Sequence, residues 1–464
     1  MARRNKHRIG SSSRRGKGFG RKLLFTLLAL IVTGGAIAGF ILFETEAPQV
    51  SIDKELKFLG GPVDIAFHAV DQKSGIKQVV ITLEQGGGIF QLFNKSFPRQ
   101  AWLSKAGPAE VKETITLDAK HAGAKDGKAE LIIAINDFSL NGILRGNATV
   151  ARFPVTIDTK PPRVTVQHAQ KYITPGGSGI VVYNLSEPSD RHGVMIDSTF
   201  FQGYPINGSD KQFISYIALT WNSKKPENTR VIAIDQAGNE GKAIFSMHFK
   251  KAKEKKDRIN VSDGFLNKKI PEFQEHYPDM QGSDLEKYLF VNNKVRTSNA
   301  EKIAGICSNT LPDQLWHDRF IRMAGAGKAG FADQRTYYYQ GKPVDYQTHL
   351  GMDIASTERV AIKAANSGKV IFADYLGIYG NTVILDHGQG LTSLYSHLSR
   401  IDTTTDTMVD KEEVIGHSGT TGMAGGDHLH YSMLVHGIFV TPVEWWDQHW
   451  IDVNINNIIN DSQL

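Results

Sequence analysis

An uncharged apolar stretch near the N-terminus restricts how this 464-residue chain can fold more than any other feature. Residues 23–43 contain no charged side chain, whereas residues 1–22 contain nine Lys or Arg and no Asp or Glu. As a helix rising about 1.5 Å per residue, the stretch spans roughly 30 Å, which matches the hydrocarbon core of a bilayer. The basic flank is expected to stay in the cytoplasm. The sequence therefore predicts a cytoplasmic tail (1–22), a single-pass anchor in the cytoplasmic (inner) membrane (23–43), and C-terminal domains in the periplasm or extracytoplasmic space.

A cleaved signal peptide is the competing interpretation of the same stretch. Ala36, Ile37 and Ala38 resemble the small-residue site at which such peptides are cut. The apolar run, however, continues from Phe40 to Phe43, directly after the hypothetical cut, and this is too apolar for the typical start of an exported protein. We therefore favour the uncleaved anchor.

Composition removes two classes of protein from consideration. The formal charge of the whole chain is +5, and removing the nine basic residues of the tail leaves −4 for residues 23–464. Because a nucleic-acid-binding domain needs a basic surface on its folded part, no nucleic-acid partner is expected. The chain has one cysteine, Cys307, so an internal disulfide framework is excluded, and the domains must be stabilised by hydrophobic cores and metal.

Residues 44–250 have the pattern of β structure, arranged in two units. Short alternating segments are separated by Gly, Asn and Asp turns. The two halves echo each other, because a strand runs into an Asx or Gly turn at Ala134–Asp137 and again at Ala233–Asn239. Tandem immunoglobulin-like sandwiches would give this repeat. We predict one such unit over residues 44–158 and a second over residues 159–250, serving as a spacer or positioning arm.

The next segment, residues 251–325, is predicted to be a linker followed by helices. A charge run at residues 250–257 marks the linker. Ser283–Glu286 and Ser298–Glu301 both match the capping-box pattern that begins a helix. Cys307 falls at helical spacing after them, so we interpret it as a small core residue and not as a nucleophile. The sequence leaves open whether this segment supports the fold of the next domain or shades its groove.

Histidines and one aspartate are spaced like metal ligands towards the C-terminus. His349 and Asp353 are four residues apart, and His428 and His430 follow later, with His397 between the two pairs. In a strand, residues i and i+2 point to the same face, so the two histidines of the His-x-His pair would enter one groove. Three His or Asp ligands with an open fourth position are the arrangement of catalytic zinc sites. The pattern therefore predicts such a site, with one histidine of the pair free to move a proton.

A series of short stretches between about residue 330 and residue 445 surrounds these side chains. They are Thr348–Ala355, Gly368–Val370, Tyr379–Asn381, Asp386–Gly388, Leu394–Leu398, Val414–Gly422 and Gly426–Tyr431. Together they resemble the lysostaphin/LytM-type zinc metallopeptidases, which cut peptide bonds in bacterial cell-wall peptidoglycan. One departure is visible, since family members often carry Phe-Glu after His-x-His and this chain has Tyr431-Ser432. We expect that change to affect the flank of the groove.

The resemblance implies an antiparallel-β zinc peptidase domain, which we place at residues 326–450, with a C-terminal tail at 451–464. It further implies that Zn²⁺ is held by His349, Asp353 and His430. Zinc in such sites lowers the pKa of a water to about 7 and polarises the carbonyl that is cut. The predicted fold class is therefore mainly β, with an N-terminal transmembrane helix, two immunoglobulin-like units, a helical segment and the peptidase domain.

The same resemblance implies that His397 and His428 are the catalytic histidines. A neutral imidazole can take a proton from water, and an imidazolium can stabilise the oxyanion or protonate the leaving amine. The sequence does not decide which histidine has which role. The remaining histidines of this region are interpreted as structural or surface residues: His387, His417, His436 and His449.

These expectations combine into a membrane-anchored zinc metalloendopeptidase that hydrolyses peptide bonds in peptidoglycan, with cell-division or wall-synthesis proteins as candidate partners. Two alternatives are weaker because all five site residues are present. One is a non-catalytic wall-binding protein that activates a separate cell-wall amidase, and the other is a structural or adhesive wall protein built on the immunoglobulin-like units. The sequence leaves open which bond is cut, and whether a loop, the helical segment or Asn381 fills the open zinc position in a latent state.

Overall fold

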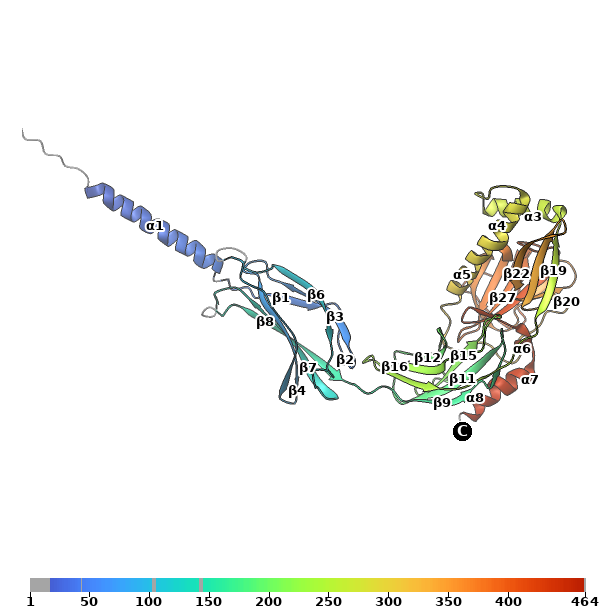
Figure 1. Ribbon diagram of the computed structural model, residues 1–464, viewed down its shortest axis with the longest axis horizontal. Helices are drawn as coiled ribbons and strands as arrows, with labels where there is room; N and C mark the ends of the chain where they lie inside the picture. Colours follow the sequence, from blue (N-terminus) through green and yellow to red (C-terminus); the bar gives the residue numbers. More distant parts are fainter. Residues whose placement is uncertain (1–16, 43, 102–105, 142–144, 463–464) are drawn as a thin grey trace, which may run out of the picture. The chain divides into compact units, whose positions relative to one another are not determined.

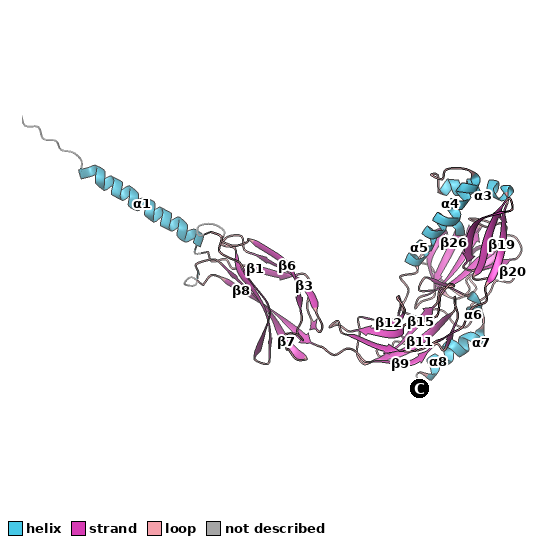
Figure 2. Ribbon diagram, in the orientation of Figure 1, coloured by secondary structure: helices cyan, strands magenta, loops and turns pink. Residues whose placement is uncertain are grey.

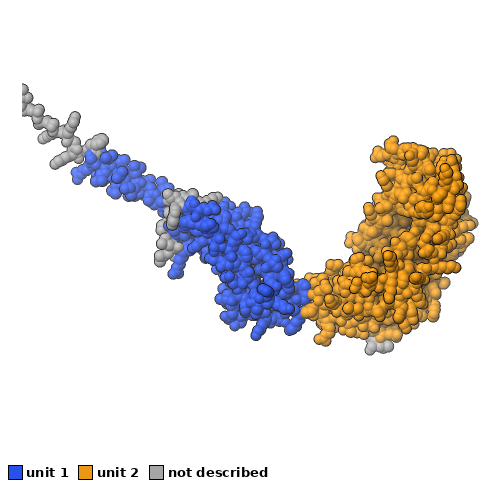
Figure 3. All heavy atoms as spheres, viewed as in Figure 1, with its two compact units in different colours: residues 1–160, 237–239 blue, residues 161–236, 240–464 orange. Residues whose placement is uncertain are grey.

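The computed structural model describes residues 17–42, 44–101, 106–141 and 145–462. Strands make up most of its regular structure (Figure 2). The chain divides into two compact units, which are residues 1–160 with 237–239 and residues 161–236 with 240–464 (Figure 3). The predicted fold class, mainly β with an N-terminal apolar helix and a β-rich C-terminal domain, is confirmed. The immunoglobulin-like assignment of the first two β regions stays a prediction.

The apolar stretch forms one long helix, α1 (Lys17–Leu42; Figure 1). From Gly20 to Gly39 its mean hydropathy is 1.9, and none of this window is buried inside the protein. By length and composition the helix could cross a membrane, and an N-terminal signal sequence would pass the same test. Most of the predicted cytoplasmic tail lies outside the described residues.

The first β region, in unit 1, contains two sheets. Its strands are β1 (Gln49–Ile52), β2 (Phe58–Leu59), β3 (Val63–Val70), β4 (Ile76–Gln85), β5 (Gly88–Ser96), β6 (Glu110–Leu117), β7 (Gly127–Asp137) and β8 (Ala148–Ile157). The sheet orders are β2-β8-β7-β4-β5 and β1-β3-β6. Alternate residues of β7, namely Leu131, Ile133 and Ile135, are buried in the core between the sheets, because successive side chains of a strand point to opposite faces.

The second β region, in unit 2, has two main sheets as well, each with four strands. Its strands are β9 (Val164–Ala169), β10 (Tyr172–Ile173), β11 (Ser178–Leu185), β12 (Arg191–Ile196), β13 (Thr199–Gln202), β14 (Tyr204–Pro205), β15 (Gln212–Ala218), β16 (Thr229–Ile234), β17 (Glu240–Ile244) and β18 (His248–Phe249). The orders are β14-β15-β11-β9 and β13-β12-β16-β17, and β10 pairs with β18. Every residue of β11 except Asn184 is buried, so this strand is covered on both faces.

The segment between the second β region and the C-terminal domain differs from the predicted linker and helices in two places. Its elements are β19 (Lys255–Val261), α3 (Asp263–His276), α4 (Asp284–Phe290), the π-helix η1 (Val291–Val295) and α5 (Arg296–Ile306). The end of the charge run is not a solvated linker, because Lys255–Asp257 begins β19, which pairs in parallel with β21 (Asp333–Tyr339). The capping box at Ser283–Glu286 is confirmed. The one predicted at Ser298 is wrong, since that residue lies inside α5, which continues directly from η1.

The C-terminal domain is an antiparallel β fold. Its further strands are β20 (Ala326–Ala329), β22 (Lys342–His349), β23 (Met352–Ala355), β24 (Ala361–Lys363), β25 (Gly368–Tyr375), β26 (Asn381–Asp386), β27 (Leu391–Leu398), β28 (Arg400–Ile401), β29 (Met408–Val409), β30 (Val414–His417), β31 (Leu429–Val435) and β32 (Ile438–Val440). The main sheet has the order β20-β23-β31-β27-β26-β25-β29, with β32 on β31. Every residue of β27 and β31 is buried, so these two strands form the rigid centre of the sheet.

The helices at the end of the chain pack between the second β region and the C-terminal sheet, and residues 451–461, expected as part of a tail, belong to them. The helices are α6 (Pro442–Trp446), α7 (Gln448–Ile451), η3 (Asp452–Asn456) and α8 (Asn457–Asp461). Trp445 is fully buried and donates its indole N–H to Ser178 Oγ at 3.1 Å. Ile451 and Ile455, four residues apart on one helix face, are buried in the same core. One hydrophobic core thus joins the second β region to the C-terminal domain.

Glu444 of α6 makes this junction sensitive to pH. Its carboxylate accepts hydrogen bonds from the backbone N–H and the hydroxyl of Ser178, at 3.0 and 2.9 Å. Burial raises the pKa of Glu444 from 4.5 to about 7, although the Ser178 hydrogen bonds oppose the shift. Between these two values the folded protein holds a proton that the unfolded chain has released, so stability falls as pH rises and the loss is complete above about pH 7.

We therefore predict that Glu444→Gln stabilises unit 2 at pH 8 and has little effect at pH 4.5. The gain is at most about 3 kcal/mol, because each unit of pKa shift corresponds to about 1.4 kcal/mol. Urea unfolding followed by circular dichroism at the two pH values measures it. The exposed Glu358→Gln is the matched control and should match wild type at both. Equal pH dependence in wild type and Glu444→Gln would contradict the assignment.

Candidate active site

Three strands bring the three predicted metal ligands together. His349 ends β22, Asp353 lies in β23, and His430 lies in β31 as the register partner of Asp353. His349 Nε2, Asp353 Oδ1 and His430 Nδ1 are 2.9 Å apart in all three pairs. All three residues are buried. Glycine is required at position 351, because a Cβ there would lie 2.5 Å from the His430 ring.

Hydrogen bonds on the outer side of each imidazole determine its protonation. His349 Nδ1 lies 2.8 Å from the Gly330 carbonyl oxygen, so Nδ1 carries the proton and Nε2 presents a lone pair. The Ser432 hydroxyl donates to the Leu350 carbonyl, and it therefore accepts from His430 Nε2 at 3.1 Å. His430 Nδ1 then also presents a lone pair. These tautomers, assigned from the hydrogen-bond network, leave three lone pairs facing one another with no proton between them.

Three converging lone pairs form a site for a cation. Two imidazole nitrogens and one carboxylate oxygen are a ligand set that zinc takes in catalytic sites, where the fourth position stays open. The outer hydrogen bonds described above are also those that orient histidine ligands of metals. The side chains of this site therefore fit zinc.

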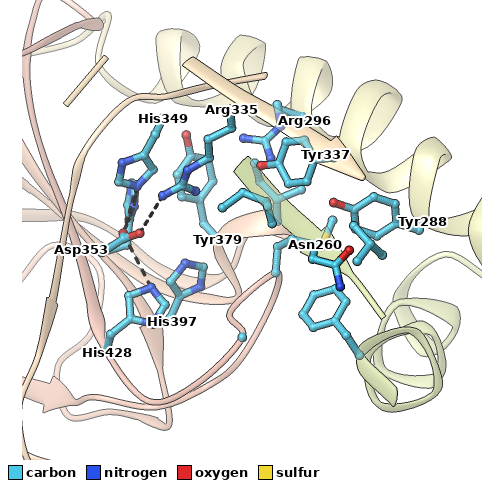
Figure 4. Close-up of a pocket in the computed structure, with 17 residues that line it drawn as sticks. Asn260, Tyr288, Arg296, Arg335, Tyr337, His349, Asp353, Tyr379, His397 and His428 are labelled. Carbon is cyan, nitrogen blue, oxygen red and sulfur yellow. Dashed lines mark hydrogen bonds and ion pairs between the residues drawn. The ribbon is translucent and has the colours of Figure 1, made fainter. Parts of the chain in front are cut away.

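An arginine from outside the predicted motif holds the second oxygen of the Asp353 carboxylate. Arg335 of β21 places its Nη2 3.1 Å from Asp353 Oδ2 (Figure 4). Burial acts to raise the pKa of Asp353, but the neighbouring His349, His428 and His430 hold it well below its ordinary value. The carboxylate is therefore ionised, with one oxygen in the ligand triangle and the other on the arginine.

The two predicted catalytic histidines lie beside this triangle, with ring centroids 4.8 Å apart. His397 Nδ1 is 2.9 Å from the Thr421 carbonyl oxygen, and His428 Nδ1 is 2.8 Å from the Gly426 carbonyl oxygen. Each ring thus donates through Nδ1 and keeps the lone pair of Nε2 available. His428 Nε2 is 3.6 Å from Asp353 Oδ1. His397 has a φ of 63°, which is uncommon for a residue other than glycine and is a form of backbone strain often found at functional sites.

Burial and charge separate the pKa values of these two histidines. Burial, and then the charges of His428 and His430, lower the pKa of His397 well below its ordinary value. Burial also acts to lower the pKa of His428, but hydrogen bonding and charge from Asp353 outweigh it, and the pKa of His428 is raised. The pair can therefore hold one neutral ring and one protonated ring, which is what proton transfer in two directions needs.

A cavity of 290 Å³ opens beside these five residues. Part of its wall comes from β19 and the helical segment, through Ile259, Val261, Phe265 and Tyr288 (Figure 4). The same segment also packs on the main sheet of the C-terminal domain, since Val295 of η1 belongs to one core with residues of β26, β27 and β31. The helical segment therefore supports the fold of the C-terminal domain and also shades its groove, the two roles that the sequence left open.

A second, more open cleft of 780 Å³ adjoins the cavity. The residues that line both are Arg296, Arg335, His349, Tyr379 and His430. The cavity and the cleft are therefore the smaller and larger lobes of one groove, and two of the predicted ligands lie where the lobes meet. Trp221, in the turn after β15, also lines the larger lobe, so the second β region contributes to the groove.

The other histidines lie outside both lobes. His387 is fully buried between the Ser367 carbonyl and the Ser393 hydroxyl, each 2.7 Å from a ring nitrogen. His417 is 2.9 Å from Asp402. The ring of His436 packs against Phe201 and Tyr204. His449 is exposed. These positions agree with the structural or surface roles expected of them.

Cys307 and Asn381 are also accounted for by packing. Cys307 is buried, and burial raises the pKa of its thiol to about 11, so it behaves as a core residue and not as a nucleophile. Asn381 donates its side-chain amide to the Leu398 carbonyl at 3.1 Å and lines neither lobe. It is therefore not positioned to fill an open metal position. Ser432, expected to alter the flank of the groove, instead lies behind the ligand His430.

Three groove residues were not predicted from the sequence. Arg335 lies in β21 and Arg296 lies in the helical segment, and neither has a recognisable motif around it. Tyr379 belongs to one of the quoted stretches, but the stretch carries no indication that the side chain faces the groove. The alternation of β21 could have pointed to Arg335, because its neighbour two residues on, Tyr337, lines the same cavity.

The C-terminal domain matches a known protein family. Residues 347–442, which include all five predicted site residues, match the model described as Peptidase family M23. The resemblance predicted from the sequence motifs is therefore confirmed for this segment.

Three curated relatives show the range of proteins that share this similarity. The chain is 37% identical over 98 residues to DD-carboxypeptidase/endopeptidase Mpg of Neisseria meningitidis, covering 21% of this chain and 23% of that protein. It is 35% identical over 96 residues to peptidoglycan DD-endopeptidase ShyC of Vibrio cholerae, covering 21% and 22%. It is 33% identical over 95 residues to murein hydrolase activator EnvC of Escherichia coli, covering 20% and 23%. The chain spans less than a quarter of the length of each relative.

Replacing a ligand and replacing a catalytic histidine should affect metal binding differently. His349→Ala removes one of the three converging lone pairs, and we expect it to weaken zinc binding by more than about 100-fold. Ser432→Ala removes only an outer hydrogen bond and should weaken binding by roughly 10- to 100-fold. His397→Ala should bind zinc like wild type. Competition with a chromophoric chelator measures all four affinities, and equal losses in His349→Ala and His397→Ala would contradict the division of roles.

Proposed function

We propose that this chain, whose residues 347–442 match peptidase family M23, is a membrane-anchored zinc metalloendopeptidase that hydrolyses peptide bonds in bacterial peptidoglycan. The observation that carries the proposal is the triangle of lone pairs, 2.9 Å on each side, with His397 and His428 beside it. Burial of three uncompensated acceptors is costly unless a cation joins them. Similarity to Mpg and ShyC supports an endopeptidase, and similarity to ShyC supports peptidoglycan as the substrate.

The five residues divide into ligands and proton carriers. A zinc ion held by His349, Asp353 and His430 would supply a water with a pKa of about 7 and polarise the carbonyl of the peptide bond. One of the two other histidines accepts a proton from the attacking water through its free Nε2. The second, in its protonated form, stabilises the oxyanion and delivers a proton to the leaving amine.

The groove agrees with cleavage inside a peptide chain. His349 and His430 line both lobes, so a substrate bound at these residues can extend into either lobe. The carbonyls of Thr421 and Gly426 keep the two catalytic rings oriented towards the substrate. Apolar residues of β19 and the helical segment keep bulk water from the smaller lobe, which strengthens the electrostatic interactions there.

The proposed site of action is the outer side of the cytoplasmic membrane. The apolar helix α1, unburied from Gly20 to Gly39, supports an anchor, and the nine basic residues before position 23 support a cytoplasmic N-terminus. The two β regions and the peptidase domain then face the cell wall, and cell-division or wall-synthesis proteins are candidate partners there.

A second candidate is a wall-binding protein that activates a separate cell-wall amidase without cutting bonds itself. Similarity to the activator EnvC favours it. An activator has no need of a complete ligand triangle, however, and the five residues of this site are all present. The enzyme is therefore the stronger proposal.

Digestion of isolated peptidoglycan distinguishes the two candidates. We expect the full-length protein in detergent, loaded with zinc, to release fragments that mass spectrometry identifies as products of peptide-bond cleavage. Chelator should abolish release and added zinc should restore it, because the lone-pair triangle needs a cation. His397→Ala, still loaded with zinc, should be at least about 100-fold slower, the usual contribution of a general acid or base. Zinc-loaded wild type that cuts no bond, yet stimulates an amidase, would replace the enzyme by the activator.

A further inference from the structure

The two lobes of the groove differ in charge. His397 and His428 line only the smaller lobe, which assigns the proton transfers to that side of the ligands. The larger lobe is lined by three cations, Lys256, Arg296 and Arg335, and by no Asp or Glu among the described residues. A groove lined by one sign of charge attracts ligands of the opposite sign. The larger lobe therefore favours an anionic part of the substrate.

Arg296 is the cation best prepared to bind such a group. Arg335 is already paired with Asp353, and Lys256 is exposed on β19. The half-buried Arg296 lines both lobes. Its Nε donates to the Asn292 carbonyl at 3.1 Å and its Nη2 to the Asn292 side-chain oxygen at 2.6 Å. Within the described part of the chain, no carboxylate oxygen lies within 4.0 Å of its guanidinium.

The guanidinium of Arg296 is held by the neutral residue Asn292, so its positive charge is not neutralised by its hydrogen-bond partner. Asn292 is fully buried, and its amide nitrogen donates to Asp345 Oδ2 at 2.7 Å, so the amide oxygen is left to hold Arg296. Two of the five N–H groups of the guanidinium are used in this way, and the others remain for a ligand. The planar fork of arginine matches a carboxylate, and orienting it beforehand lowers the entropic cost of binding.

We propose that Arg296, assisted by Lys256, binds a carboxylate of the substrate peptide in the larger lobe and so selects anionic peptides over neutral ones. This inference rests on the proposed function, because it takes a peptide as the substrate. The carboxylate belongs either to the C-terminus of the bound peptide or to an internal residue, and the same fork recognises both. Arg296 is thus a specificity residue, separate from the groups that cut the bond.

Steady-state kinetics on matched substrates tests this proposal. The substrate is a purified cross-linked stem-peptide dimer in three forms, with all carboxylates free, with only the C-terminal carboxylates amidated, and with only the internal carboxylates amidated. For the full-length, zinc-loaded protein, we expect one of the amidated forms to raise KM by roughly 10- to 100-fold, the usual range for a charge-assisted hydrogen-bonded pair, while kcat changes little. The form that does so identifies the source of the carboxylate.

Variants of Arg296 complete the test. Arg296→Gln should raise KM for the free dimer by a similar factor and add nothing further on the amidated form that wild type discriminates against. Arg296→Lys keeps the charge and loses the fork, so it should recover part of the affinity. The matched control is Lys294→Gln, which removes one charge from the same helical segment at an exposed position outside both lobes and should match wild type. Circular dichroism melts verify that each variant is folded.

The outcomes separate this inference from the proposed function. Equal KM values for the free and both amidated dimers, or an Arg296→Gln effect that is the same on all three, would overturn the carboxylate site while the peptidase remains. If zinc-loaded wild type cuts none of the dimers, the proposed function fails, and fluorescence anisotropy with labelled dimers tests the site by binding alone. Tighter binding of the free form, lost in Arg296→Gln, would then still support it.

Discussion

The convergence of His349, Asp353 and His430 on one buried point is the constraint on which the candidate site depends. The pairing of β23 with β31 sets Asp353 opposite His430, and Gly351 lets the chain pass close enough to the His430 ring for His349 to complete the triangle. Burial deprives these three atoms of hydration, and a cation bound among them would offset that cost. A metal ion bound by these three atoms would stabilise the fold that brings them together.

The residues that were correctly predicted to lie close together are those that belong to short sequence motifs. His349 and Asp353 share one short stretch, and the His-x-His pair needed only the two-residue period of a strand. Arg296 could not be found in this way, because it reaches the groove through helix packing that no local pattern encodes. Arg335 has only the alternation of β21 to point to it, and the pairing of β21 with β22 places that strand beside the site.

Two segments differ from what the sequence predicted, and in both cases contacts with distant parts of the chain are the reason. Residues 255–257 look like a solvated charge run, yet parallel pairing with β21 makes them a strand in which Lys255 and Lys256 stay exposed. Residues 451–462 look like a polar tail, yet Ile451 and Ile455 dock in the core beside Trp445. Through that core, and through Trp221 in the larger lobe, the second β region is part of the groove's support and not merely a spacer.

Anomalous diffraction at the zinc absorption edge, from crystals of the protein grown with zinc, tests the central claim most directly. The account predicts one strong peak in contact with His349 Nε2, Asp353 Oδ1 and His430 Nδ1, and no such peak in crystals of chelator-treated protein. A zinc-replete crystal without density at those three atoms, or with zinc held by other residues, would contradict it.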